Sequence, residues 1–198
     1  MLRREIGDSR GLALSQHCLG LVAFARGDLE RALSLQTDSL AGFRRLGFKR
    51  YIGWALLQMA HIDHELGDDE HARGHAVEAL QSAVQRGDKQ GIADCLDLFA
   101  DLSVMRGDWQ RAAHGWGAAD DVREQIGARR ALTSSAAHDR QLTRAEAAVG
   151  KPTLTLWLAQ GRSLSDEEAV ALGHETVSID ADVDDAAGWP LSASRKFQ

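Results

Sequence analysis

A glycine recurs at every twentieth position over the first two thirds of the chain, and this spacing constrains the fold more than any other feature. The series comprises Gly7, Gly27, Gly47, Gly67, Gly87, Gly107 and Gly127. Repetition with a period of about 20–50 residues is typical of solenoids, in which each unit buries its apolar face against its neighbours. The spacing therefore predicts a repeat array.

Comparison in steps of forty residues aligns three units, at about 8–46, 48–86 and 88–126. Each contains a Gly-Asp pair that is followed four residues later by an alanine. The alanines are Ala32, Ala72 and Ala112. Large side chains align at Leu19, Met59 and Phe99, and branched ones at Val22, Ile62 and Leu102. Because large and small positions keep their register, the three units are expected to share one backbone plan.

The segments between glycines have the pattern of amphipathic helices. Apolar residues recur at three and four spacing, as in Leu29, Leu33, Leu40 and Phe43. Glycine suits the left-handed position that follows a helix, and the aspartate after it suits an N-cap. We therefore expect an all-α, right-handed superhelix of antiparallel helix pairs, with about seven long helices and one or two short ones.

The twenty-residue step fails after Gly127, which divides the predicted chain into three parts. Residues 1–150 are expected to form the repeat domain, including one closing helix, and residues 151–173 a short helical cap. Ser165 and Glu168 form a capping box that predicts a helix at 166–172. Residues 174–198 are acidic and lack periodicity, which favours a disordered tail. Residues 1–6 resemble the end of a repeat helix, so the chain is expected to begin inside a unit.

Composition favours a cytoplasmic protein that does not bind nucleic acid directly. The formal net charge is -6 and the pI is about 5.7, whereas proteins that bind nucleic acid usually carry a basic face. The chain has neither a secretory signal nor an apolar run long enough to span a membrane. Cys18 and Cys95 lie at non-equivalent positions of their units, so both are expected to be free thiols.

The units resemble tetratricopeptide repeats. The resemblance rests on Leu19-Gly20 and on the segment from Gly27 to Ala32, where small residues let the two helices of a pair approach closely. Gln16 and Ala23 stand at the family's aromatic positions, no proline closes the unit, and the period is forty residues instead of about thirty-four. The resemblance implies a helical scaffold with longer helices than usual.

Nearly the whole chain also resembles the C-terminal repeat region of large bacterial signalling ATPases, which often end in a LuxR-type DNA-binding helix-turn-helix. The matching residues are 117–123, 126–128, Trp157 and 161–165. A phosphate-binding loop and a basic helix after Leu172 are both missing from this sequence. The resemblance therefore implies a fragment or reduced paralogue that acts as a non-enzymatic interaction or sensor module, without a cofactor. Its expected partners are a protein, a peptide or other domains of a parent regulator.

The first helix of each tetratricopeptide unit lines a concave groove, which selects candidate binding residues. These are His17, Trp54, His61, His64, Asp94, Asp97 and Asp101. The spacing predicts an imidazole pair that faces a stripe of carboxylates, and such a surface favours a basic peptide or a cationic ligand. One alternative is a small-ligand or metal site, because two histidines and a carboxylate suit zinc. A further alternative is a LuxR-type regulator that binds DNA directly. The oligomeric state is left open.

Overall fold

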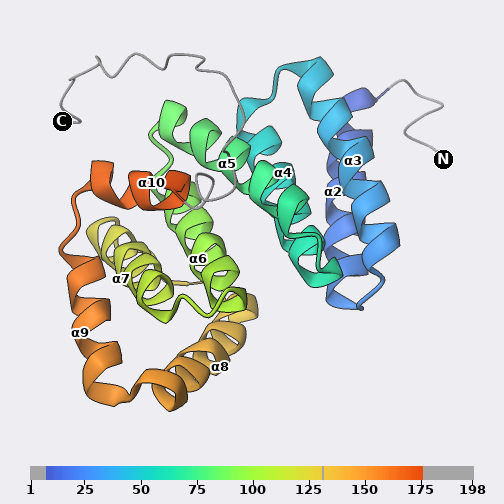
Figure 1. The fold of residues 1–198 in the computed structure, drawn as a ribbon. Helices are drawn as coiled ribbons and strands as arrows, with labels where there is room; N and C mark the ends of the chain where they lie inside the picture. Colours follow the sequence, from blue (N-terminus) through green and yellow to red (C-terminus); the bar gives the residue numbers. More distant parts are fainter. Residues whose placement is uncertain (1–7, 131, 176–198) are drawn as a thin grey trace, which may run out of the picture.

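The computed structural model describes residues 8–130 and 132–175, and it confirms an all-α, tetratricopeptide-like solenoid. Over these residues the chain forms helices and no strand (Figure 1). The helices are α2 (Ser9–Ala25), α3 (Leu29–Leu46), α4 (Lys49–Leu66), α5 (Asp69–Arg86), α6 (Lys89–Met105), α7 (Trp109–Gln125), α8 (Leu132–Val149), α9 (Lys151–Arg162) and α10 (Asp166–Glu175).

The glycine series marks the helix ends, as predicted. Every member from Gly27 to Gly127 has a positive φ between 62° and 78°, a region that other residues rarely adopt. Asp68, Asp88 and Asp108 then accept a hydrogen bond from a backbone amide of the next helix. Asp28 occupies the same position but makes no side-chain cap. One helix therefore stops and the next begins within two or three residues.

The helices form two layers. The first helices of the units, α2, α4 and α6, contact one another in sequence, whereas α3, α5 and α7 contact mainly the first helices. Helices on the inner side of a curved array lie closer together than those outside, so α2, α4 and α6 form the inner layer. Ala32, Ala72 and Ala112 are fully buried and keep each pair tightly packed.

Consecutive units stack through the aligned branched residues. Ile62 of the second unit is buried against Ala23 and Ala32 of the first. Leu102 of the third unit shares a buried cluster with Ala72 of the second. At each junction a branched apolar side chain in the same register position thus packs on the preceding unit, as the forty-residue register predicts.

The array changes direction after the third unit. Although α8 follows α7 in sequence, it is the next helix, α9, that packs along α7 (Figure 1). A β-carbon at Gly117 of α7 would overlap the carbonyl oxygen of Leu158, and one at Gly161 of α9 would overlap that of His114. These two glycines allow the backbones to touch, so α9 covers the end of the array where a further repeat would stack.

Helix α10, the last of the described helices, returns over the junction between the second and third units. Helix α10 contacts α5, α6 and α7, and its Ala169 is buried among residues of α6 and α7. Arg111 of α7 donates a hydrogen bond from Nη2 to the carbonyl oxygen of Leu172 (2.8 Å). The predicted capping box is present, because Ser165 and Glu168 satisfy each other's backbone amides. The helix extends to Glu175, three residues beyond the predicted end.

Two expectations concern residues that are not described. Residues 1–6 and the tail after Glu175 lie outside the described part of the chain. The division into a repeat domain, a cap and a tail therefore stays a prediction. Within residues 8–130 and 132–175, none of the helices has the length and hydropathy needed to cross a bilayer.

Candidate functional site

Trp54 is the predicted groove residue that the structure leaves most accessible. Its side chain lies on α4 and is 41% exposed. The ring meets Tyr51 edge-on with 5.3 Å between centroids, and the guanidinium carbon of Arg50 lies 5.1 Å from the indole centroid. Tyr51 in turn stacks on buried Phe43 at 5.0 Å. The indole is therefore held in place by the core while one side of it remains open to solvent.

The structure separates the three predicted histidines. His17 faces its own partner helix instead of the groove: it is buried, and its Nδ1 lies 2.9 Å from Oε1 of Gln36 in α3. His61 and His64 lie near one another on α4. Burial and the charge of His64 together lower the pKa of His61 to about 4, although Asp97 of α6 opposes both. An imidazole pair thus does lie near one of the predicted carboxylates.

The predicted carboxylate stripe is not free, and this corrects the expectation of an acidic groove. Arg123 donates from Nη2 to Asp94 and Asp97, at 2.7 Å in both cases. Arg130 makes two further bonds to Asp97, at 3.0 Å from Nε and 2.7 Å from Nη2. Because these arginines neutralise the stripe, a basic partner gains little from it.

The third aspartate of the stripe is also occupied. Asp101 accepts a hydrogen bond from the indole Nε1 of Trp116 at 3.2 Å. Burial raises the pKa of Asp101 to about 7, and the negative charge of Asp97 adds to the effect. Trp116 itself is fully buried. Asp101 therefore belongs to the junction between α6 and α7 more than to an open binding surface.

The metal-site alternative gains no geometric support. Over residues 8–130 and 132–175, no three or more histidine, cysteine or carboxylate side chains converge as ligands around a common point. His64 has its Nδ1 3.9 Å from Asp69 of α5 and no hydrogen bond there. The residues of the predicted His-Asp cluster thus face different helices. His64 lies towards Asp69 of α5, His61 lies near Asp97 of α6, and Asp101 is bonded to Trp116 of α7.

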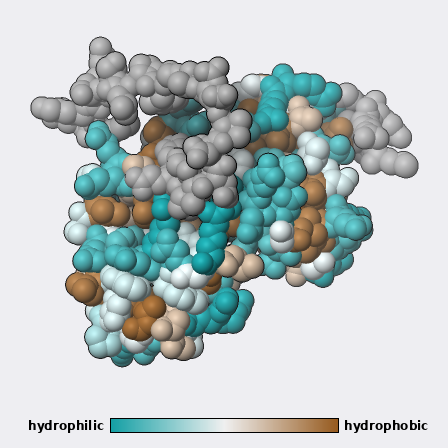
Figure 2. Space-filling model, viewed as in Figure 1, coloured by the Kyte–Doolittle hydropathy of each residue, from teal (hydrophilic) through white to brown (hydrophobic). Residues whose placement is uncertain are grey.

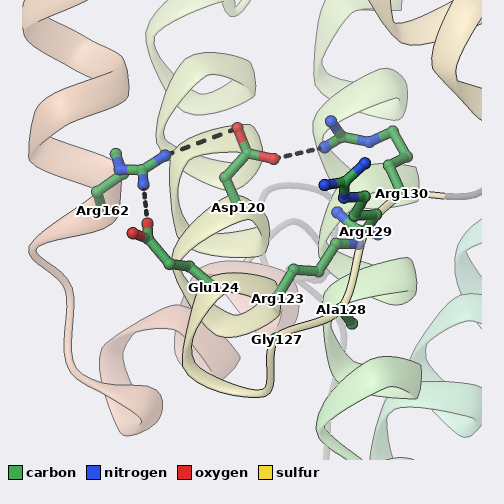
Figure 3. A pocket seen from close by; sticks show the side chains of 8 residues that line it. All are labelled: Asp120, Arg123, Glu124, Gly127, Ala128, Arg129, Arg130 and Arg162. Atoms are coloured by element: carbon green, nitrogen blue, oxygen red, sulfur yellow. Dashed lines mark hydrogen bonds and ion pairs between the residues drawn. The ribbon is translucent and has the colours of Figure 1, made fainter.

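A hollow lined by arginines lies where α7, the segment after it and α9 meet, with a volume of about 440 Å³. Figure 3 shows Arg123, Arg129 and Arg130 gathered on one side and Arg162 on the other. Asp120 lies between the two sides and pairs with Arg130 (3.1 Å) and Arg162 (3.9 Å). The ion pairs that line this hollow link α9 to the repeat array.

The arginines of this hollow are not equally satisfied. Arg123 is nine-tenths buried, and its Nε and Nη1 have no hydrogen-bond partner among the described residues. Arg129 is exposed and makes no ion pair within the described part of the chain. Burial alone would lower the pKa of Arg130, but Asp97 and Asp120 raise it above its ordinary value. Arg129 therefore offers an exposed guanidinium at the hollow, whereas the two unpaired nitrogens of Arg123 are closed off from solvent.

The sequence pattern did not predict this hollow. Arg123 aligns with Phe43 and Ala83 in the repeat register, so its charge departs from an apolar position. That departure was the available signal. Arg130 follows Gly127, where the period fails, and no register could place it beside Asp97.

Comparison with known proteins supports the helical repeat. Residues 11–83 match the family model described as "Tetratricopeptide repeat". Such repeats are generally non-enzymatic scaffolds for protein–protein interaction. No solved structure matches the chain.

Three curated relatives each match over 160 residues at 27% identity. All are named "Putative HTH-type transcriptional regulator", one from Mycobacterium bovis and two from strains of Mycobacterium tuberculosis. The match covers 81% of this chain and 18% of each relative, so this chain spans a minor part of their length. With its matched residues 11–83 continued by the same forty-residue register, the chain is a tetratricopeptide-like helical solenoid.

Proposed function

We propose that this chain is the protein-interaction module of a transcriptional regulator, and that it holds a protein segment on the inner layer at Trp54. The observation that carries the proposal is the exposed indole of Trp54, fixed between Tyr51 and Arg50. Tryptophan, tyrosine and arginine dominate the energetic centres of protein interfaces. A rigid, half-open indole binds with little loss of side-chain entropy.

The similarity to the mycobacterial regulators supports the regulatory part of this proposal. Their names attribute an HTH-type activity to the whole proteins, of which the matched region is 18%. A chain with a net charge of -6 lacks the long-range attraction that drives binding to DNA. We therefore assign this chain to partner binding, and we propose that the parent protein is a signalling ATPase of the kind that its sequence resembles.

Two features of the surface indicate the chemistry of the partner: the position of Arg50, and the ion pairs that Asp94 and Asp97 make with Arg123. Arg50 lies beside the indole, whereas the neighbouring carboxylates are bonded to Arg123. The surface at Trp54 is thus apolar with a cationic edge. It suits a peptide that presents a large apolar side chain next to an acidic one.

A peptide selection tests this assignment. Random peptides displayed on phage are selected against the full chain, and binders are compared on Trp54→Ala and on Leu156→Ala, which removes an even more exposed apolar side chain from α9. The expected binders carry an apolar-acidic motif and lose roughly 30-fold or more in affinity on Trp54→Ala. Binders that lose affinity only on Leu156→Ala would contradict the proposal.

The unpaired donors of the arginine hollow favour a second candidate function, the binding of a small anion. Arg129 is exposed and makes no ion pair among the described residues. Guanidinium groups bind phosphate oxygens with paired, charge-assisted hydrogen bonds. The exposed guanidinium of Arg129 can hold a phosphate group at the hollow, beside the C-terminal end of α7.

Titration with inorganic pyrophosphate tests this candidate. Calorimetry should detect binding that Arg129→Ala weakens about tenfold and that added salt suppresses. Arg44→Ala is the matched control, because Arg44 pairs with Glu78 on a different surface. Equal affinity in both variants would remove the candidate.

A further inference from the structure

Helix α2 exposes two apolar side chains whose equivalents in the other two units are buried. Leu19 is 51% exposed, whereas its equivalents Met59 and Phe99 are 6% and 3% exposed. Val22 is 47% exposed, whereas Ile62 and Leu102 are 0% and 3% exposed. Figure 2 shows hydrophobic surface over the α2–α3 pair at this end of the molecule. Because these residues occupy equivalent positions of equivalent helices, the difference in exposure arises from the presence or absence of a preceding unit.

The internal junctions show what these positions pack against. Ile62 contacts Ala32, the alanine that follows the Gly-Asp turn of the preceding unit. Leu102 shares a buried cluster with Ala72, the equivalent alanine one unit later. In both cases a branched side chain lies in a cluster with the small residue of a helix pair. Val22 has the same shape and register, so it fits the same kind of surface.

The two ends of the array differ in this respect. At the far end, α9 lies against α7 through the close approach of Gly117 and Gly161. At the near end, among the described residues, α2 packs extensively against α3 and makes a small contact with α4. The exposed face of α2 continues the series of unit junctions and has no described partner.

We infer that the face formed by Leu19 and Val22 is an interface for one further helix pair of the same repeat type. The partner presents a small residue, in the position of Ala32 and Ala72, to Val22. This inference does not rest on the proposed function at Trp54, because Leu19 and Val22 lie on α2 whereas Trp54 lies on α4. It assigns α2 to the interior of a longer array.

Extending the intact chain tests the inference. A copy of residues 48–80 is attached in front of Met1, so that Gly7 falls in the register of Gly87 and the copied Ala72 faces Val22. Cys18 serves as the reporter because it is exposed one turn before Val22, while Cys95 is buried. Alkylation of Cys18 should slow about tenfold in the extended chain, as expected for a site that reacts only after local opening.

Two variants make the test specific. Leu19→Asp with Val22→Asp should restore fast alkylation in the extended chain and leave the melting temperature of the original chain unchanged. Fast alkylation in the extended chain without these substitutions would overturn the inference. A dimer of the original chain that Val22→Asp dissociates would also overturn it, because the occupant would then be a second copy.

Discussion

Asp101 is a partly buried carboxyl whose ionisation opposes folding. Burial, reinforced by Asp97, raises its pKa to about 7 in the folded chain. In the unfolded chain the pKa of the same group is about 4. The folded state therefore binds the extra proton between these values. The stability that this proton contributes is present below about pH 4 and is lost as the pH rises through 7.

Asp101→Asn should stabilise the protein at alkaline pH. Asparagine keeps an oxygen for the indole of Trp116 and cannot ionise, so the free energy of unfolding should rise by roughly 1–3 kcal/mol near pH 8. The gain should vanish near pH 4. Urea unfolding at both pH values measures it, with the exposed Asp38→Asn as the control. Equal effects of Asp101→Asn at both pH values would contradict the burial of the charge.

His61 acts in the opposite direction. Burial, with the charge of His64, lowers its pKa to about 4 in the folded chain, below the ordinary value of 6.5. Its contribution to stability is present above pH 6.5 and is lost as the pH falls through about 4. Because Asp101 and His61 offset each other in this window, single variants are needed to separate them.

At the scale of helices, the crossing of α7 and α9 depends on two glycines. A methyl group at Gly161 would overlap the backbone of His114, and α9 can relieve this overlap only by moving away from α7. Gly161→Ala should therefore lower the free energy of unfolding by about 1–3 kcal/mol or more.

Gly74→Ala provides the matched control for this prediction. Gly74 lies within α5, and a β-carbon there would meet nothing within 4 Å. Alanine favours the helix by about 1 kcal/mol relative to glycine, so this variant should be more stable. Thermal unfolding distinguishes the two. A neutral Gly161→Ala would show that α9 is free to shift.

The helix boundaries could be predicted from the glycines because a positive φ is a local requirement that glycine meets. The position of α9 could not, because two glycines 44 residues apart in the numbering, Gly117 and Gly161, reveal a contact only when the path of α8 is known. His17 was misplaced for a related reason. The register identified its helix, but the polar Gln36 of α3 determined which way it faces.

At the scale of the molecule, stability should decrease from the α9 end towards α2. Units of a solenoid are held by their neighbours, and terminal units open first. The third unit is covered by α9 and α10, whereas α2 has an exposed outer face. Hydrogen exchange measured by mass spectrometry should show the fastest exchange in α2 and the slowest in α6 and α7. Uniform protection across the three units would contradict this.

The return of α10 across the second and third units also determines an order of events during synthesis. Each helix pair can form as soon as its forty residues have left the ribosome, because its contacts are local. Helix α10 finds its place only after α5, α6 and α7 are assembled, and its bond from Arg111 to Leu172 spans 61 residues. Helix α10 is translated after both units and thus closes the seam between two units that are already folded, and a nascent chain released before Leu172 leaves that seam open.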